Sequence, residues 1–175
     1  MKARFWLALL LVIVGVVYRV VPHPWNFAPV GAIALFAGAT FERRWTAVVI
    51  PLVTMFIGDL FVGLHALMPL LYATYALIAV LGMLLRERRT SPVAIGGGAL
   101  ASATIFFVLS NFGMWALGMY YPRTWDGLVT CFVNAIPYFG NTLASDLIFS
   151  ACLFGLFHVG QTLLPAARAG VSESQ

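Results

Sequence analysis

The stretch PHPWNFAPVGAIALFAG, from Pro22 to Gly38, predicts a stiff polar head followed by a short buried helix. The head begins with the segment Pro22-His23-Pro24-Trp25-Asn26. Pro22, Pro24 and Pro29 have a fixed φ and no N–H, so the head cannot lie inside a helix. Pro29 suits the first turn of a helix, where the missing N–H is not needed. The head is therefore expected to present its polar side chains from a rigid segment.

Small residues recur through the apolar part of this stretch at Gly31, Ala34 and Gly38. They lie roughly one helical turn apart, and small residues at such a spacing let helix backbones approach closely in a bilayer. We therefore expect a central helix over residues 28–41, around which the other segments pack. The alternative is an ordinary loop followed by an ordinary packing helix.

The composition predicts an integral membrane protein. Of the 175 residues, 62% are hydrophobic and 9% are charged, whereas soluble domains have about 25% charged residues. A spanning helix needs about 20 residues, so the chain has room for about six spans and for no soluble catalytic domain. Cys131 and Cys152 form no metal or redox spacing, and no cofactor is expected.

Apolar runs separated by charged or proline-containing turns predict six spanning helices, at residues 5–21, 28–41, 45–64, 67–85, 91–118 and 139–164. Part of the polar and aromatic connection 119–137, namely 127–135, is expected to form a short helix at the membrane surface. Residues 1–164 then form a single transmembrane domain, and 165–175 form a disordered cytoplasmic tail. The expected fold is an all-α, six-helix membrane bundle.

The basic residues orient this bundle. With the N-terminus in the cytoplasm, Arg19 and Arg123 lie outside and the other eight basic residues lie inside. The inner residues are Lys2, Arg4, Arg43, Arg44, Arg86, Arg88, Arg89 and Arg168. This asymmetry follows the positive-inside rule and places both termini in the cytoplasm. Basic clusters between apolar runs are typical of membrane topology, and they do not indicate nucleic-acid binding.

Polar side chains gather at the predicted outer end of the bundle. A charge at mid-membrane costs about 2.5–3.5 kcal/mol, so Asp59 and Asp146 are expected to face a cavity or a partner such as Arg123, His23 or His65. The candidate ligand-binding residues are His23, Trp25, Asn26, Asp59, His65, Asn111, Tyr121, Arg123, Asn141 and Asp146. A buried polar network that only locks the helices together is the alternative.

A weak internal repeat relates the two aspartates. Asn26 precedes Asp59 by 33 positions, Asn111 precedes Asp146 by 35, and each asparagine is followed by phenylalanine. If the repeat is real, it divides the chain into two three-helix halves, and transporters often place their binding site where such halves meet. Chance similarity between apolar stretches is the alternative.

No catalytic arrangement is present in the sequence. It contains no nucleophile elbow, no His-Glu-x-x-His and no carboxylate pair at metal spacing within one predicted helix. An enzyme is therefore not predicted. An intramembrane enzyme that uses Asp59 and Asp146 together stays open as a less favoured alternative.

Four stretches resemble an uncharacterised family of small bacterial membrane proteins: PHPWNFAPVGAIALFAG from Pro22, SNFGMW from Ser110, YPRTWDGL from Tyr121 and NTLASDLIF from Asn141. That family is distantly similar to the substrate-binding S components of energy-coupling-factor vitamin transporters. The resemblance implies a multi-pass protein of the bacterial inner membrane, with a site near its outer face for a vitamin or another micronutrient. It also implies that an ATP-driven module can be a partner, although some such subunits act alone.

One feature departs from the S components. Their first helix often carries Ala-x-x-x-Ala for docking the ATP-driven module, whereas here Ala8 is followed by Val12. The sequence predicts a membrane-embedded protein that captures a small solute from the outer side without covalent chemistry. The alternative is a structural or assembly subunit of a membrane complex.

Overall fold

The structure is a computed structural model that describes residues 2–172, and over this range it is all-helical, with no strand. Its helices are α1 (Lys2–Val20), α2 (Val30–Thr40), α3 (Arg44–Val62), α4 (Met68–Leu84), the 3-10 turn η1 (Arg86–Arg88), α5 (Pro92–Ala116) and α6 (Trp125–Ser172). Within the described residues, α3, α5 and α6 are long and apolar enough to cross a membrane, and α2 and α4 are shorter apolar helices. The expected all-α membrane protein is thus confirmed at this level. The predicted disordered tail, 165–175, extends beyond the described residues and stays a prediction.

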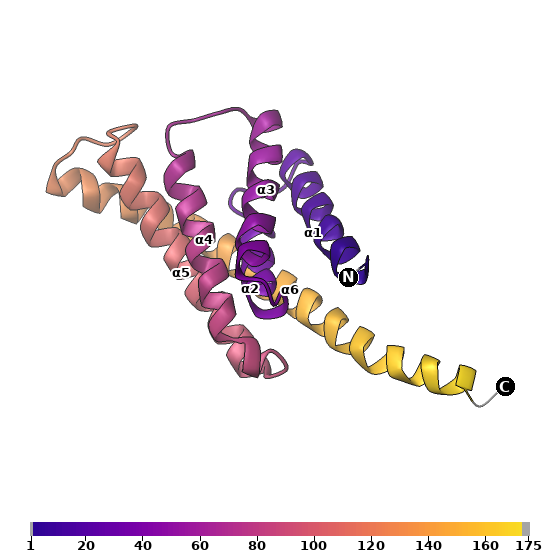
Figure 1. The fold of residues 1–175 in the computed structure, drawn as a ribbon. Coiled ribbons are helices and arrows are strands. Elements are labelled where there is room, and N and C mark those ends of the chain that lie inside the picture. The colour runs from indigo at the N-terminus through magenta and orange to yellow at the C-terminus, as the bar shows by residue number, and fades with distance from the viewer. Residues whose placement is uncertain (1, 173–175) are drawn as a thin grey trace.

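Connected helices run in opposite directions. The α1–α2, α3–α4 and α5–α6 connections therefore lie at one end of the molecule, and the α2–α3 and α4–α5 connections lie at the other (Figure 1). The first of these ends, formed by the connections 21–29, 63–67 and 117–124, is called the outer end below. It carries the polar head that precedes α2.

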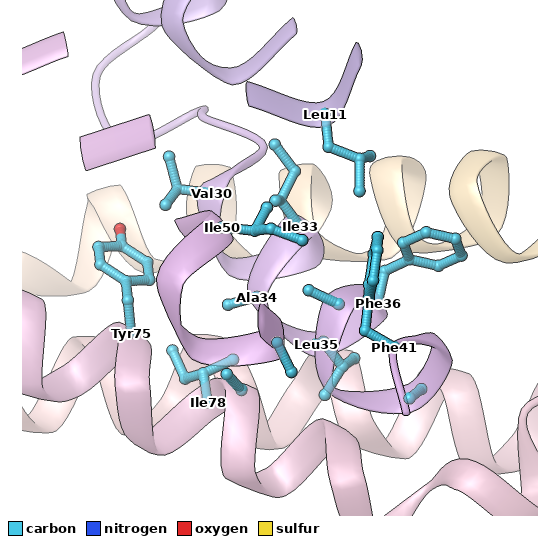
Figure 2. Packing of buried hydrophobic residues seen from close by; sticks show 14 of the residues in the cluster. Leu11, Val30, Ile33, Ala34, Leu35, Phe36, Phe41, Ile50, Tyr75 and Ile78 are labelled. Carbon is cyan, nitrogen blue, oxygen red and sulfur yellow. The ribbon is translucent and has the colours of Figure 1, made fainter. Parts of the chain in front are cut away.

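α2 forms the buried centre of the molecule. All residues from Val30 to Ala39 are buried, as expected for a helix that is apolar on every side. The helix packs against α3, α4, α5 and α6. Figure 2 shows its side chains among Leu11 of α1, Ile50 of α3 and Ile78 of α4. The central helix expected from the sequence is therefore confirmed.

α2 and α4 touch backbone to backbone. A Cβ at Gly38 would overlap the carbonyl oxygen of Ala79, and a Cβ at Gly82 would overlap that of Leu35. Glycine is therefore required on both helices at the crossing. This is the close approach that the small-residue pattern predicted.

Arg86 closes the inner end of α2. Its Nε donates to the carbonyl oxygen of Gly38 at 3.0 Å, and its Nη2 donates to that of Phe41 at 2.7 Å. The last carbonyl groups of a helix lack intrahelical partners and carry partial negative charge, so a guanidinium group stabilises them. An arginine that the sequence assigned only to membrane topology therefore also fixes the central helix.

α6 differs from the prediction. A surface helix over 127–135 was expected to precede a separate spanning helix, but Trp125–Ser172 is one helix. Thr124 starts it, because its Oγ1 accepts a hydrogen bond from the N–H of Gly127 at 3.1 Å. Pro137 does not end the helix, since proline is tolerated in membrane helices whose surroundings satisfy the freed carbonyl group. The resulting long helix crosses the others and extends beyond them (Figure 1).

Candidate functional site

A cavity of about 560 Å³ lies at the outer end, beside the polar head. Small-molecule pockets typically measure about 300–1,000 Å³, so this volume suits a small solute. The polar side chains that line it are Arg19, His23, Asn26, His65, Tyr75, Thr142 and Asp146. Apolar side chains complete the wall, among them Met55, Leu71 and Phe106.

The polar head is fastened to α6 through its backbone. Nδ2 of Asn141 donates to the carbonyl oxygen of Trp25 at 2.9 Å, and one turn later Oγ of Ser145 donates to that of Ala28 at 2.7 Å. The predicted ligand-binding residue Asn141 thus uses its amide group on the protein itself. These two bonds hold the head over the cavity.

The head presents His23 to the cavity in a defined orientation. Its Nδ1 lies 2.7 Å from the carbonyl oxygen of Val21. A carbonyl oxygen only accepts hydrogen bonds, so Nδ1 carries the proton, and Nε2 of the neutral ring remains an acceptor. The ring also packs against that of Tyr18, with centroids 5.4 Å apart. Asn26 has a φ of 61°, a left-handed conformation that asparagine adopts more readily than most residues.

Asp59 on α3 is fully buried and forms an ion pair with Arg19 of α1. Nη2 of Arg19 bonds to one carboxylate oxygen, and the hydroxyl group of Tyr72 donates to the other at 2.8 Å. Arg19 passes over Gly58, where a Cβ would overlap its side chain. Asp59 therefore joins α1, α3 and α4 in a network in which both charges are compensated.

Arg19 lines the cavity, and the sequence did not predict it as a site residue. It was predicted only as a basic residue on the outer side, near the end of the first helix, but its side chain is only 17% exposed. The partners suggested for the buried aspartates, His23, His65 and Arg123, bond to neither of them within the described part of the chain. A signal was present, because Arg19 and Asp59 both lie near the outer ends of predicted helices. Sequence alone could not show that those ends touch.

Asp146 on α6 is also buried, but it is held by neutral donors. Oγ of Ser102 donates to its Oδ2 at 2.7 Å, and the backbone N–H of Ala32 donates to the carboxylate. A Cβ at Gly31 would overlap this carboxylate. The neighbouring α2 begins after Pro29, which provides no side-chain cap. Asp146 therefore caps α2 from another helix, where the partial positive charge of the helix N-terminus favours an anion.

Three of the predicted residues lie away from the cavity: Asn111, Tyr121 and Arg123. Nδ2 of Asn111 donates at 2.7 Å to a carbonyl oxygen one turn earlier on its own helix. The Tyr121 hydroxyl accepts from Nδ2 of Asn134 at 3.3 Å. Arg123 is exposed and lies against Gly118 in the connection between α5 and α6. These residues belong to the outer connection and to α5 rather than to the cavity wall.

The structure brings the other predicted residues together. Those that line the cavity are His23, Trp25, Asn26, His65 and Asp146. Asp59 lies behind Arg19, which lines the cavity. Tyr75, Phe106 and Thr142 were missed, because aromatic and hydroxyl residues on apolar helices look the same in sequence whether they face a cavity or a neighbouring helix. Among the described residues, no group of three or more His, Cys, Asp or Glu could hold a metal ion.

A family model described as "Family of unknown function (DUF6580)" matches residues 1–167. The chain belongs to this family. The DUF6580 match includes every residue that lines the cavity. The chain matches no curated protein and no solved structure. Membership of an uncharacterised family, expected from the quoted stretches, is thereby confirmed, and the DUF6580 description names no ligand.

Proposed function

We propose that this DUF6580 protein is a membrane-embedded binding protein that captures a small solute, a vitamin or another micronutrient, from the outer side. The observation that carries the proposal is the cavity of about 560 Å³, on which polar side chains from α1, the head and α6 converge. The head is already ordered by prolines and by its bonds to α6, so little conformational entropy is lost in ordering it when a solute binds. Uptake would then follow by reorientation or gating, without covalent chemistry.

The proposal includes six spans in a bacterial inner membrane, with both termini in the cytoplasm. The eight basic residues assigned to the inside support this orientation. Only Arg19 and Arg123 are assigned to the outside, and the charge of Arg19 is compensated by its ion pair with Asp59. Cysteines placed singly near Arg88 and Arg123, in a background without Cys131 and Cys152, should be labelled from opposite sides. Labelling of both from one side would overturn the topology and the outward-facing site with it.

The proposal includes a role like that of an S component, which the bundle of six helices with a cavity at its outer end supports. An ATP-driven module is therefore a candidate partner. Val12 replaces the second alanine of the usual docking pattern, so we propose that any docking uses a surface other than that pattern.

The proposal is tested by native mass spectrometry of protein purified gently in detergent. The expected result is a co-purified small molecule whose occupancy falls in His23→Ala. Asn134→Ala, at an exposed position outside the cavity, is the matched control and should keep full occupancy. Absence of any bound small molecule, in the purified protein and after incubation with a micronutrient mixture, would contradict the proposal.

A structural or assembly subunit is the second candidate, and one observation favours it. Both buried aspartates have their hydrogen bonds provided by the protein itself, through Arg19 and Tyr72 in one case and Ser102 and Ala32 in the other. Under this alternative, Asp146→Asn would lower the melting temperature and no solute would bind.

A further inference from the structure

We infer that the solute is a small organic cation whose positive charge meets the carboxylate of Asp146. This inference rests on the proposed function and specifies the chemistry of its ligand. It starts from the unequal compensation of the two buried aspartates, because only one of them is paired with a basic residue.

The charged and titratable groups that face the cavity are Arg19, His23, His65, Tyr75 and Asp146. The charge of Arg19 is cancelled by Asp59 directly behind it. Asp146 is therefore the one acidic side chain on this lining, and among the described residues its bonds come from Ser102 and Ala32 and from no basic side chain. An uncompensated ion in a low-dielectric interior is costly, and a ligand of opposite charge removes that cost.

The surroundings of Asp146 keep it available to such a ligand. Ser102 and the backbone N–H of Ala32 donate to the carboxylate, so both of these bonds come from groups that carry no charge. The N-terminus of α2 adds partial positive charge but no full counter-charge. A carboxylate has about four acceptor positions, so these two donors leave acceptor capacity free. Asp146 lines the cavity, and that remaining capacity is available to a donor there.

The wall of the cavity favours an organic cation over a bare metal ion. The rings of Tyr75 and Phe106, with centroids 5.7 Å apart, both line it, as do the apolar side chains of Met55 and Leu71. Aromatic rings attract ammonium groups through their negative faces. A hard metal ion instead needs several oxygen ligands around it. The free Nε2 of His23 provides a second acceptor for an ammonium N–H.

The test uses three probes that share a phenyl ring and differ in charge: benzylammonium, benzyl alcohol and benzoate. Each is titrated at neutral pH into the full-length protein in detergent, and binding is read as a rise in melting temperature. We expect benzylammonium to bind about tenfold or more tightly than the other two, since close charge pairs contribute at least this much. Asp146→Asn should abolish this preference.

Two variants keep the test decisive if Asp146→Asn proves unstable. Ser102→Ala removes a donor but keeps the carboxylate, and it should retain the preference for the ammonium probe. Asp126→Asn, at an exposed position in the first turn of α6, should behave as the unmodified protein. Persistence of the ammonium preference in Asp146→Asn would overturn the inference.

The remaining outcomes separate this inference from the proposed function. Three outcomes would overturn the inference of an organic cation and leave the proposed solute binding intact. They are preferential binding of benzoate or benzyl alcohol, stabilisation by sodium or potassium ions alone, and a co-purified solute that is neutral or anionic. A co-purified organic cation supports the inference even if none of the fragments binds. Absence of probe binding together with absence of any co-purified solute overturns both.

Discussion

Asp59 and Asp146 are both buried aspartates, yet the protein compensates their charges in different ways. Asp59 is paired with the guanidinium group of Arg19, and the hydroxyl group of Tyr72 completes its bonding. Asp146 receives neutral donors and the N-terminus of α2. The first network pairs an acid with a base, whereas the second leaves an acidic side chain without a basic partner at the cavity. The comparison therefore assigns helix locking to Asp59 and α2 capping to Asp146, and it is the basis for the proposed role of Asp146 in ligand binding.

The largest expected effect comes from breaking the ion pair. Asp59→Asn leaves Arg19 as an unpaired buried cation, so we expect the free energy of unfolding in detergent to fall by about 3–5 kcal/mol. Asp146→Asn strands no partner charge and should cost at most about 2 kcal/mol, through its lost interaction with the α2 N-terminus. Chemical denaturation followed by circular dichroism measures both.

The double variant Arg19→Met/Asp59→Asn is the control for this prediction. It should recover much of the loss, because neither charge remains. Equal destabilisation by Asp59→Asn and Asp146→Asn would show that the two aspartates are compensated alike, against the structure.

The second prediction compares the two hydroxyl donors by deleting each one. Ser102→Ala removes one of the two donors to Asp146 and should lower the free energy of unfolding by about 1.5–3 kcal/mol, the usual range for a bond to a charged group. Tyr72→Phe leaves Asp59 bonded to Arg19 and should cost about 0.5–1.5 kcal/mol. The same denaturation measurement gives both values. A larger loss for Tyr72→Phe than for Ser102→Ala would contradict the prediction that Asp146 relies more on its hydroxyl donor than Asp59 does.

The third prediction concerns the glycine beside each network. A Cβ at Gly31 would overlap the Asp146 carboxylate, and one at Gly58 would overlap the Arg19 side chain. Gly31→Ala should cost about 1–3 kcal/mol, as overpacking usually does. Gly58→Ala should cost less, because the longer arginine side chain can shift. Gly140→Ala is the control: nothing lies within 4 Å of the added Cβ, so thermal melting should show no loss.

The smallest effect on stability is expected in the head. His23→Ala should change the free energy of unfolding by no more than about 0.5 kcal/mol, since the ring is only partly buried. It should nevertheless lower the occupancy of the bound solute seen by native mass spectrometry. Asn26→Gly, which keeps the left-handed backbone, tests the neighbouring side chain without strain. Full occupancy of the solute in both variants would show that these two side chains of the head do not bind it, and that the head only connects α1 to α2.

Much of this fold was readable from sequence. The apolar run after Pro29 predicted a central helix, because a helix without a polar face must be buried on all sides. Gly38 predicted the close helix crossing, and the structure places it against Ala79 of α4. The break predicted near Pro137 was wrong, because neighbouring helices can satisfy the carbonyl group that a proline leaves free.

The sequence by itself determined which residues are costly to expose to lipid, and therefore that Asp59 and Asp146 must find partners or a cavity. Their similar spacing to an asparagine suggested two related three-helix halves. Only the tertiary structure decided that Arg19 neutralises one aspartate while α2 begins at the other. Hydrophobicity and backbone restriction are properties of each residue and its neighbours in the chain. Charge compensation depends on which helices meet, and residues 40 positions apart reveal that only when the chain has folded.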